Sequence, residues 1–419
     1  MTSYETAMAA SVTSAPSSPA LARVRRGNLC AGCGGCALVA PGAVTMQMEP
    51  PGYLRPHQSA PLSAEQEARI AAICPGLGQG VDPAGRTDDV LWGPYVSMSV
   101  GWSTDPELRF AASSGGGLSA ALTHLLTTGA VDGVIQTGAD PDIPVANLTR
   151  LSQSAADVQA AAGSRYAPSA PLAGLESYLQ GEGRYAFVGK PCDVAALRAL
   201  SAHDPRVDVR IPVMLSFFCA GVPSQEGAEA ILAKLGTDLA STAAFRFRGN
   251  GWPGRATATL KDGTTRDMSY FDSWGGILSN HVQLRCKVCA DGTGKAADLV
   301  FADAWHSDDR GYPLFEEQDG VSLIVARTPA GAALLAELEA RQVLQTQPFD
   351  IATLADIQPG QSGRRRALLA RLTGLALLGR VRPRYVGLNI LAAGRQNSLK
   401  STLRNCLGLV RRGLLGRLG

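Results

Sequence analysis

The sequence is poor in aromatic side chains and has no long apolar run. Phe, Trp and Tyr make up 6% of the 419 residues, so we expect no platform of stacked rings for nucleic acid. No stretch of about 18 uncharged apolar residues occurs, which argues against a membrane-spanning helix. The first 22 residues are rich in Ser and Ala but have no apolar core, so no secretory signal peptide is expected. The expected location is the cytoplasm.

Acidic residues are missing from the last part of the chain. Residues 361–419 contain twelve Arg, one Lys and no acid, a net charge of +13. Because the whole chain carries +3, the first 360 residues carry −10. Apolar residues recur at helical spacing in this tail, with arginines between them: Leu403, Leu407, Val410, Leu414 and Leu418. A basic amphipathic helix would lie on the inner membrane face or an acidic partner, or pack on the acidic body of this chain.

Nine cysteines in a chain without an export signal point to metal or redox chemistry rather than to structural disulfides. Cys30, Cys33 and Cys36 form the C-x2-C-x2-C run of bacterial ferredoxins, and the glycines between them let backbone N–H groups approach the sulfurs. Ala40 stands where such a run has its fourth cysteine, and Cys74, in a Cys-Pro pair, supplies a remote one. We predict one [4Fe–4S] cluster on Cys30, Cys33, Cys36 and Cys74. A zinc site, which more often uses two separated C-x2-C pairs, is the alternative.

Other cysteines are expected at the ends of strands in an α/β body. Residues 185–189 read as an apolar strand that a Gly-Lys-Pro turn joins to Cys192 and a helix, and residues 209–219 read as a strand ending at Cys219. In a parallel sheet the carboxyl ends of both strands lie at the same edge. Free N–H groups at the helix start favour a thiolate at Cys192.

A C-x2-C pair completes this second group. A second [4Fe–4S] cluster is predicted on Cys192, Cys219, Cys286 and Cys289. Zinc, or a thioredoxin-like redox pair within the C-x2-C, is the alternative. Cys406, on the tail helix, needs no role beyond that of a small apolar residue.

Two glycine-bearing turns are candidate ligand sites. Residues 111–117 lead into an amphipathic helix that ends at Gly129, and a glycine loop that opens a helix can bind an anion. The spacing matches neither the Rossmann nor the P-loop pattern, so a plain turn and cap is an equal alternative. The second turn is at residues 161–168. There, Arg165 would bind a phosphate and the neighbouring Tyr166 a ring, or both would be ordinary surface residues.

The order of these motifs, from about residue 30 to 327, resembles the beta-subunit family of coenzyme F420 hydrogenases and dehydrogenases, in both its amino- and carboxy-terminal modules. The family is related to ferredoxin-dependent hydroxymethyl chlorophyll a reductase and divinyl chlorophyllide reductase. Residues 248–254 look like those of bacterial members found with exopolysaccharide genes. The resemblance implies an FAD that lies against the glycine loops, beside the second cluster. The residues that it assigns to FAD are Ser114, Gly115, Gly116, Gly117, Gly163, Ser164, Arg165, Tyr166 and Lys190.

The resemblance implies an iron–sulfur flavoprotein oxidoreductase. It would move electrons between ferredoxin or a partner subunit, two [4Fe–4S] clusters and FAD, to or from a hydride-accepting substrate. That substrate would be coenzyme F420 or a cell-envelope or polysaccharide-related intermediate. The alternatives are a non-catalytic electron-transfer subunit of a larger redox complex and a zinc-bearing scaffold. Nothing in the chain reads as a hydrogenase metal site.

Further polar residues have two interpretations each. His281, Asp303 and His306 are candidates for proton delivery, or are structural. Arg246 and Arg248 would receive an anionic substrate, or lie on a solvated strand face.

The predicted fold is α/β with a mixed sheet, in five parts. These are a flexible lead (1–27), a ferredoxin-like cluster segment (28–90), a flavin-binding module (91–175), a module with the second cluster (176–345) and a basic helical tail (361–419).

Overall fold

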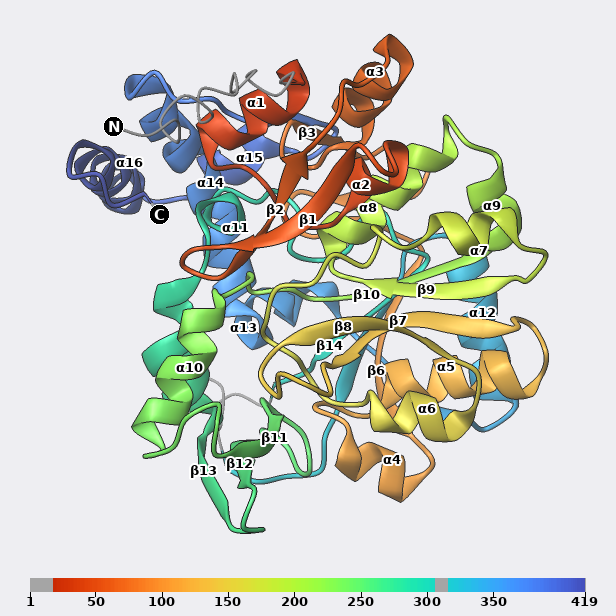
Figure 1. The fold of residues 1–419 in the computed structure, drawn as a ribbon. Coiled ribbons are helices and arrows are strands. Elements are labelled where there is room, and N and C mark those ends of the chain that lie inside the picture. The colour runs from red at the N-terminus through yellow and green to blue at the C-terminus, as the bar shows by residue number, and fades with distance from the viewer. Residues whose placement is uncertain (1–17, 306–315, 419) are drawn as a thin grey trace, which may run out of the picture.

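A computed structural model describes residues 18–305 and 316–418 of the chain, and its centre is a mixed sheet (Figure 1). Within these residues the sheet has eight strands, in the order β16-β6-β15-β14-β10-β9-β7-β8. Across the sheet they are β16 (Leu344–Pro348), β6 (Ser97–Ser103), β15 (Ser322–Ala326), β14 (Leu299–Asp303), β10 (Val213–Phe217), β9 (Tyr185–Gly189), β7 (Gly133–Ala139) and β8 (Asn147–Ser152). The central strands β14, β10, β9 and β7 are parallel, and the outer pairings are antiparallel. The predicted mixed sheet is confirmed, and the carboxyl ends of the parallel strands meet at one edge.

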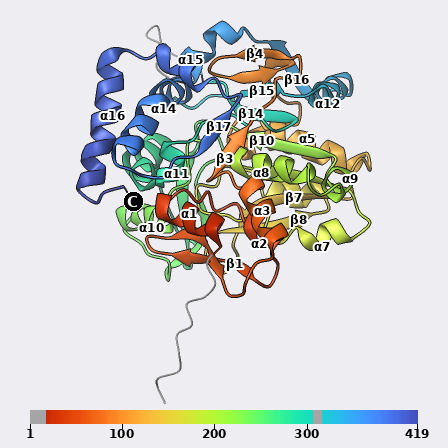
Figure 2. The ribbon, with the colours of Figure 1, turned by 90° about the horizontal axis from the view of Figure 1, so that it is seen from above.

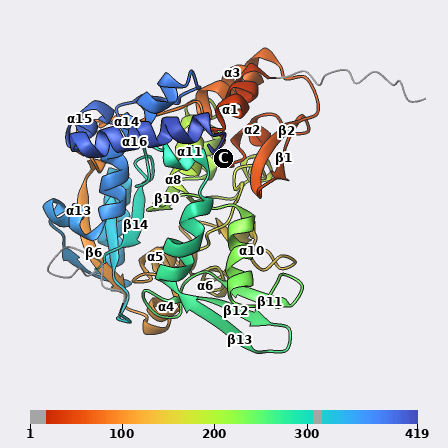
Figure 3. The ribbon, with the colours of Figure 1, turned by 90° about the vertical axis from the view of Figure 1, so that its left-hand side faces the viewer.

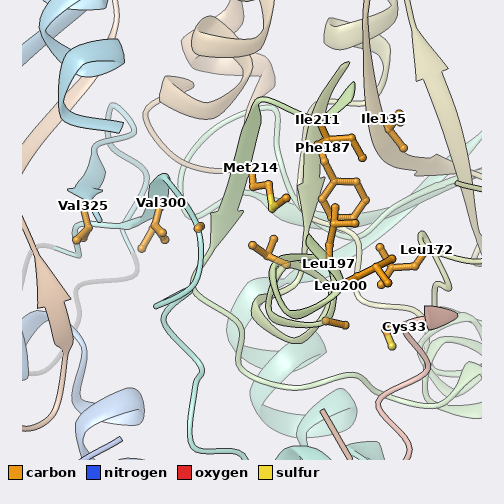
Figure 4. Close-up of a cluster of buried hydrophobic side chains, with 14 of the residues drawn as sticks. Cys33, Ile135, Leu172, Phe187, Leu197, Leu200, Ile211, Met214, Val300 and Val325 are labelled. Atoms are coloured by element: carbon orange, nitrogen blue, oxygen red, sulfur yellow. The ribbon is translucent and has the colours of Figure 1, made fainter. Parts of the chain in front are cut away.

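The parallel strands are apolar runs because helices cover both of their faces. One face packs Phe187, Met214 and Val300 against Leu197 and Leu200 of α8 (Pro191–Ser201) (Figure 4). The other face packs against α5 (Gly117–Thr127) and α12 (Pro329–Ala340). The strand–turn–helix predicted around Cys192 is confirmed, and so is the helix after the glycine loop.

The amino-terminal segment packs on α8. It consists of α1 (Pro19–Gly27), α2 (Gly35–Val39), the hairpin β1 (Val44–Glu49)–β2 (Tyr53–Gln58) and α3 (Ala64–Ile73). Figure 2 shows α3 lying beside α8. The prediction of a flexible lead is wrong for residues 19–27, because Ser18 caps α1 and Leu21 and Val24 are buried. The earlier residues of the lead lie outside the described part of the chain.

A second, three-stranded sheet lies beside the main one, next to α10 (Gln225–Lys234). Its strands are β11 (Thr242–Arg246), β12 (Arg255–Leu260) and β13 (Thr265–Ser269), and the hairpin predicted at Asp262-Gly263 joins the last two. The prediction of a strand from residue 209 is wrong at its start. Residues Arg206–Arg210 form helix α9, in which Val209 is exposed, and Asp204 accepts a hydrogen bond from the N–H of Arg206.

The carboxy-terminal residues are helical, as predicted. They form α14 (Pro359–Leu377), α15 (Ile390–Arg395) and α16 (Leu399–Leu414), and α16 lies across α14 on the outside of the molecule (Figure 3). In the described part of the chain, no helix is both long and apolar enough to cross a membrane.

Candidate functional site

The four cysteines of the first predicted set line one cavity. Cys30 and Cys33 come from the loop before α2, Cys36 is the second residue of α2, and Cys74 follows the last residue of α3. The loop needs glycine at position 34, where φ is 85° and a Cβ would stand 2.6 Å from the backbone nitrogen of Ala173. The N–H of Gly32 points at the sulfur of Cys30, 3.3 Å away. The local sequence therefore presents thiols and peptide N–H groups to the same small space.

The first cysteine set is also electrostatically coupled. Burial, with a contribution from the neighbouring Cys30, raises the pKa of the Cys74 thiol to about 11. Burial likewise raises the pKa of Cys33 and of Cys36, and in each case a second thiol of the set adds to the effect. Such thiols stay protonated until a metal replaces their protons.

The second predicted set is brought together from three distant segments. Cys192 lies in the first turn of α8, Cys219 lies just beyond β10, and Cys286 lies in α11 (Leu284–Lys287), three residues before Cys289. Burial, with contributions from Cys286 and Cys289, raises the pKa of Cys219 to about 12. Burial also raises the pKa of Cys192, with contributions from Cys219 and Cys286. The four thiols therefore lie within electrostatic reach of one another.

No group of three or more His, Cys, Asp or Glu side chains in residues 18–305 and 316–418 is arranged to hold a single metal ion. The first set instead surrounds a cavity. In a [4Fe–4S] cluster each cysteine binds a different iron, so the sulfurs stand apart at the corners of the group. The arrangement of the first set is therefore of the kind that such a cluster would need.

Arg285 lies between the two cysteine sets, and sequence reasoning missed it. Its side chain is 1% exposed, and its Nε and Nη2 donate to the carbonyl oxygen of Pro75 at 3.1 and 2.7 Å. Pro75 follows Cys74 of the first set, and Arg285 precedes Cys286 of the second. Burial opposes its charge, but Tyr385 and the cysteines of the second set more than offset this, so its pKa is raised. No carboxylate among the described residues forms an ion pair with it, and its other hydrogen bond goes to the side-chain oxygen of Gln79 at 3.0 Å.

Helix α14 holds the loops that carry the second set. Its side chains donate to backbone carbonyl oxygens of those loops: Gln361 to Cys219 at 3.0 Å, Arg364 to Cys286 at 3.0 Å, Arg365 to Ala290 at 3.0 Å and Arg371 to Lys287 at 2.9 Å. The first part of the basic tail therefore belongs to the site and packs on carbonyl groups rather than on acidic side chains.

A larger cavity, of about 280 Å³, opens at the carboxyl ends of β9, β10 and β14. Eight of the nine residues predicted to contact FAD line it: Ser114, Gly116, Gly117, Gly163, Ser164, Arg165, Tyr166 and Lys190. Gly115 lies behind this wall and donates its N–H to the hydroxyl of Ser322 at 3.0 Å. The two glycine turns are joined by a hydrogen bond of 2.7 Å between the hydroxyls of Ser113 and Ser164. Cys219 also lines this cavity, which therefore reaches the second cysteine set.

The start of α5 faces this cavity. Gly116 precedes the helix with φ 74°, and no side chain of the described residues caps it. Gly117, Leu118 and Ser119 form the first turn, and all three line the cavity. Because first-turn N–H groups have no acceptor within the helix, this wall is suited to an anion such as a phosphate.

Two cations of the wall use their hydrogen bonds within the protein. Lys190 is 7% exposed, and its three N–H groups donate to Asp193 at 2.8 Å and to the hydroxyl and carbonyl oxygens of Ser169 at 2.7 and 3.2 Å. Burial opposes its charge, but Asp193, Cys192 and Cys219 together outweigh burial and raise its pKa. Arg165 donates to Asn147 at 2.7 Å and to three backbone carbonyl groups. Both residues form part of the wall. Because their N–H groups already donate to protein acceptors, they would attract a ligand through their positive charge rather than through hydrogen bonds.

The opposite wall is aromatic and contains a buried ion pair. Tyr166, Tyr270, Trp274 and Trp305 line it. The guanidinium of Arg248, 2% exposed, lies over the Tyr270 and Trp305 rings and makes two bonds of 2.7 and 2.8 Å to Asp303. Burial opposes this charge, but Asp303, Tyr166 and Tyr270 together outweigh burial and raise the pKa of Arg248. The interpretation of Arg248 as part of a solvated strand face is therefore wrong, and Asp303 has a structural role, which was one of its two interpretations.

The other candidate polar residues lie differently. Arg246 donates to the carbonyl groups of Ala111 and Ala162, behind the glycine turns. His281 pairs with the hydroxyl of Ser224 at 3.3 Å and does not line the cavity. His306 lies outside the described residues.

Replacing Asp303 by asparagine should lower the free energy of unfolding by about 3–5 kcal/mol, because the Arg248 charge would stay buried without its partner. Urea denaturation measures this. Asp267→Asn is the matched control, since Asp267 pairs with Arg255 at the surface and its loss should cost at most about 1 kcal/mol. Equal stability of the two variants would contradict the role given to the pair.

Comparison with known proteins gives a consistent picture. Two family models of the coenzyme F420 hydrogenase/dehydrogenase beta subunit match, the amino-terminal one over residues 98–176 and the carboxy-terminal one over residues 182–352. Coenzyme F420 hydrogenase subunit beta of Methanococcus voltae is 26% identical over 283 residues, which are 64% of this chain and 88% of the relative. The protein of the same name from Methanothermobacter thermautotrophicus is 22% identical over 65% of this chain and 89% of the relative.

A longer relative and a solved structure extend the comparison. Coenzyme F420-dependent sulfite reductase of Methanocaldococcus jannaschii is 24% identical over 77% of this chain, but the match spans only 48% of that protein. A chain of the F420-reducing [NiFe] hydrogenase complex of Methanosarcina barkeri superposes with a TM-score of 0.53 at 20% identity, covering 68% of this chain and 96% of that one. This last likeness concerns the fold. The first cysteine set and helices α14 to α16 lie outside both family-model ranges.

Proposed function

The chain belongs to the coenzyme F420 hydrogenase/dehydrogenase beta-subunit family, and from this membership we propose that it is an iron–sulfur flavoprotein oxidoreductase. It exchanges electrons between ferredoxin or a partner subunit and a hydride-accepting substrate. Coenzyme F420 is the first candidate substrate because the curated relatives are named for it. One observation carries the proposal. The protein has two sets of four cysteines, and the second set borders the large cavity.

Each set of cysteines would hold one [4Fe–4S] cluster. Cys30, Cys33, Cys36 and Cys74 would bind the first, and Cys192, Cys219, Cys286 and Cys289 the second. When bound, clusters carry single electrons and a flavin exchanges one or two, so that the two cofactor types together connect a one-electron donor to a hydride acceptor. Arg285 would place a positive charge between the clusters.

The large cavity would hold FAD. The first turn of α5 offers peptide N–H groups to the diphosphate, and the Tyr166, Tyr270 and Trp305 wall offers flat apolar surface to a ring. Lys190 would contribute charge from a fixed position, because Asp193 and Ser169 hold its ammonium group. The protein thus excludes water and orients the ligand with side chains that are already paired.

Replacing Ser119 by glutamate tests the diphosphate position. Ser119 is the third residue of α5, from which a glutamate can reach back to the free N–H groups of the helix start. The acid should stabilise the helix yet repel a phosphate, so we expect the dissociation constant of FAD to rise at least about tenfold. Titration of FAD into flavin-depleted protein, followed by fluorescence, measures it.

Ser119→Gln is the matched control for this variant, since it adds the same bulk without the charge. FAD should bind the glutamine variant much more tightly than the glutamate variant. If both variants bind FAD as the unaltered chain does, the diphosphate does not lie at α5.

The second candidate is an electron-transfer subunit whose catalytic partner is another chain. It is favoured by the fold, which matches a chain from a multi-subunit hydrogenase complex. The isolated, cofactor-loaded chain decides between the two. Reduction of F420 by reduced ferredoxin at a steady rate supports the enzyme, whereas oxidation of ferredoxin or dyes without F420 reduction supports the subunit. A cell-envelope intermediate would be the next substrate to try.

A further inference from the structure

The outermost helix, α16, has an unpartnered apolar face. It packs on α14 through Leu409, which is 1% exposed, whereas Leu399, Leu403, Leu407 and Leu414 are 83%, 60%, 61% and 77% exposed. Residues spaced by four or seven lie on one side of a helix, so these four leucines form a single row along it. The helix has 16 residues, and the row runs for most of its length of about 24 Å. The sequence left open whether this tail helix packs on the body. In the structure it does so through Leu409, while the four leucines of the row stay exposed.

A row of cations runs next to the leucines. Lys400, Arg404 and Arg411 share one side of the helix by the same spacing rule, and all three are exposed. Residues 361–419 contain no acid that could neutralise them. Around the helix there are thus three adjacent sectors: one packed on α14, one apolar and open, and one cationic. A helix that lies in a bilayer surface has this arrangement, because its leucines enter the acyl boundary while its cations stay among the headgroups.

We propose that α16 binds the chain to the surface of a membrane that contains anionic lipids. The complementary charge argues for this occupant, since such a surface meets the whole cationic row as well as the leucines. Residues 361–419 also lie beyond the family-model range, which ends at residue 352, so the shared part of the family does not account for this surface. The proposal is independent of the cofactors proposed above. Binding through α16 would make the chain a peripheral membrane protein. The large cavity lies in the body of the molecule and not on this helix.

Point variants of the full chain test this better than truncation, because Gln361, Arg364 and Arg365 of α14 hold the cysteine loops. The purified chain should sediment with vesicles of phosphatidylcholine and phosphatidylglycerol in equal parts, and hardly with phosphatidylcholine alone. Replacing both Leu403 and Leu407 by aspartate should weaken this binding at least about tenfold, since two apolar side chains no longer leave water. Each of Arg404→Gln and Arg411→Gln should weaken it about fivefold.

Val209→Asp is the matched control, because Val209 is 60% exposed on α9, a different part of the molecule. It should bind anionic vesicles as the unaltered chain does. The proposal is overturned if the unaltered chain does not sediment with anionic vesicles, or if the leucine variant sediments equally well. It is also overturned if the leucine variant only converts a dimer to a monomer in size-exclusion chromatography, since the occupant would then be a second copy of the chain.

Discussion

Replacing Cys219 by serine should remove about half of the iron and acid-labile sulfide from the anaerobically purified chain. The reason is geometric: Cys219 is half-buried and lies within electrostatic reach of Cys286 and Cys289, and a hydroxyl at its position leaves the second set with three thiols. The first set lies in a separate cavity, between α1, α2 and α3, and should keep its cluster. Iron and sulfide assays, with the visible spectrum, measure the loss.

The ninth cysteine provides the control. Cys406 lies on α16, outside both sets, and Cys406→Ser should keep the full iron content. Cys30→Ser should remove the other half, and the variant that carries both Cys30→Ser and Cys219→Ser should be almost free of iron. If Cys219→Ser retains all of the iron, or if the unaltered chain holds zinc instead, the second cluster is excluded.

Replacing Arg285 by glutamine should make both clusters harder to reduce. Reduction adds negative charge, and the buried guanidinium beside Cys286 and Pro75 stabilises that charge at both sites. Losing it should shift both potentials to more negative values by on the order of 50 mV, the equivalent of about 1 kcal/mol for one electron. A redox titration followed by electron paramagnetic resonance measures each cluster separately.

Arg285→Lys is the comparison, since it keeps the charge but loses part of the fork that binds the carbonyl oxygen of Pro75. Its potentials should stay closer to those of the unaltered chain than those of the glutamine variant. A shift in one cluster alone would assign Arg285 to that site only, and unchanged potentials in the glutamine variant would contradict its position between the two.

Elements set by local sequence were predictable. The apolar run at 185–189 with its Gly-Lys-Pro turn, and the glycine loop before α5, carry their own signals for strand, turn and helix. The same signals predicted which edge of the sheet bears the cavity, because parallel strands place their carboxyl ends together. Helix α1 was missed because it is only nine residues long and contains three arginines, although Ser18 and Pro19 are a regular helix start.

Contacts between distant segments could not be predicted. Arg285 lies 210 residues from Pro75, and Arg365 lies 75 residues from Ala290, so neither partner could be found by spacing. The charge of the sequence suggested that Arg364 and Arg365 belong to a uniform basic tail. In the structure their side chains donate hydrogen bonds to backbone carbonyl groups beside the second cysteine set. A structural role for Asp303 was one of its two interpretations, but its partner Arg248 could not be named, because Arg248 comes from another segment.

The most direct measurement is the content of iron, acid-labile sulfide, zinc and flavin per chain after anaerobic purification. Two [4Fe–4S] clusters and one flavin predict about eight iron and about eight sulfide per chain, with one FAD and a brown solution. A colourless protein that holds zinc and neither sulfide nor flavin would contradict the account.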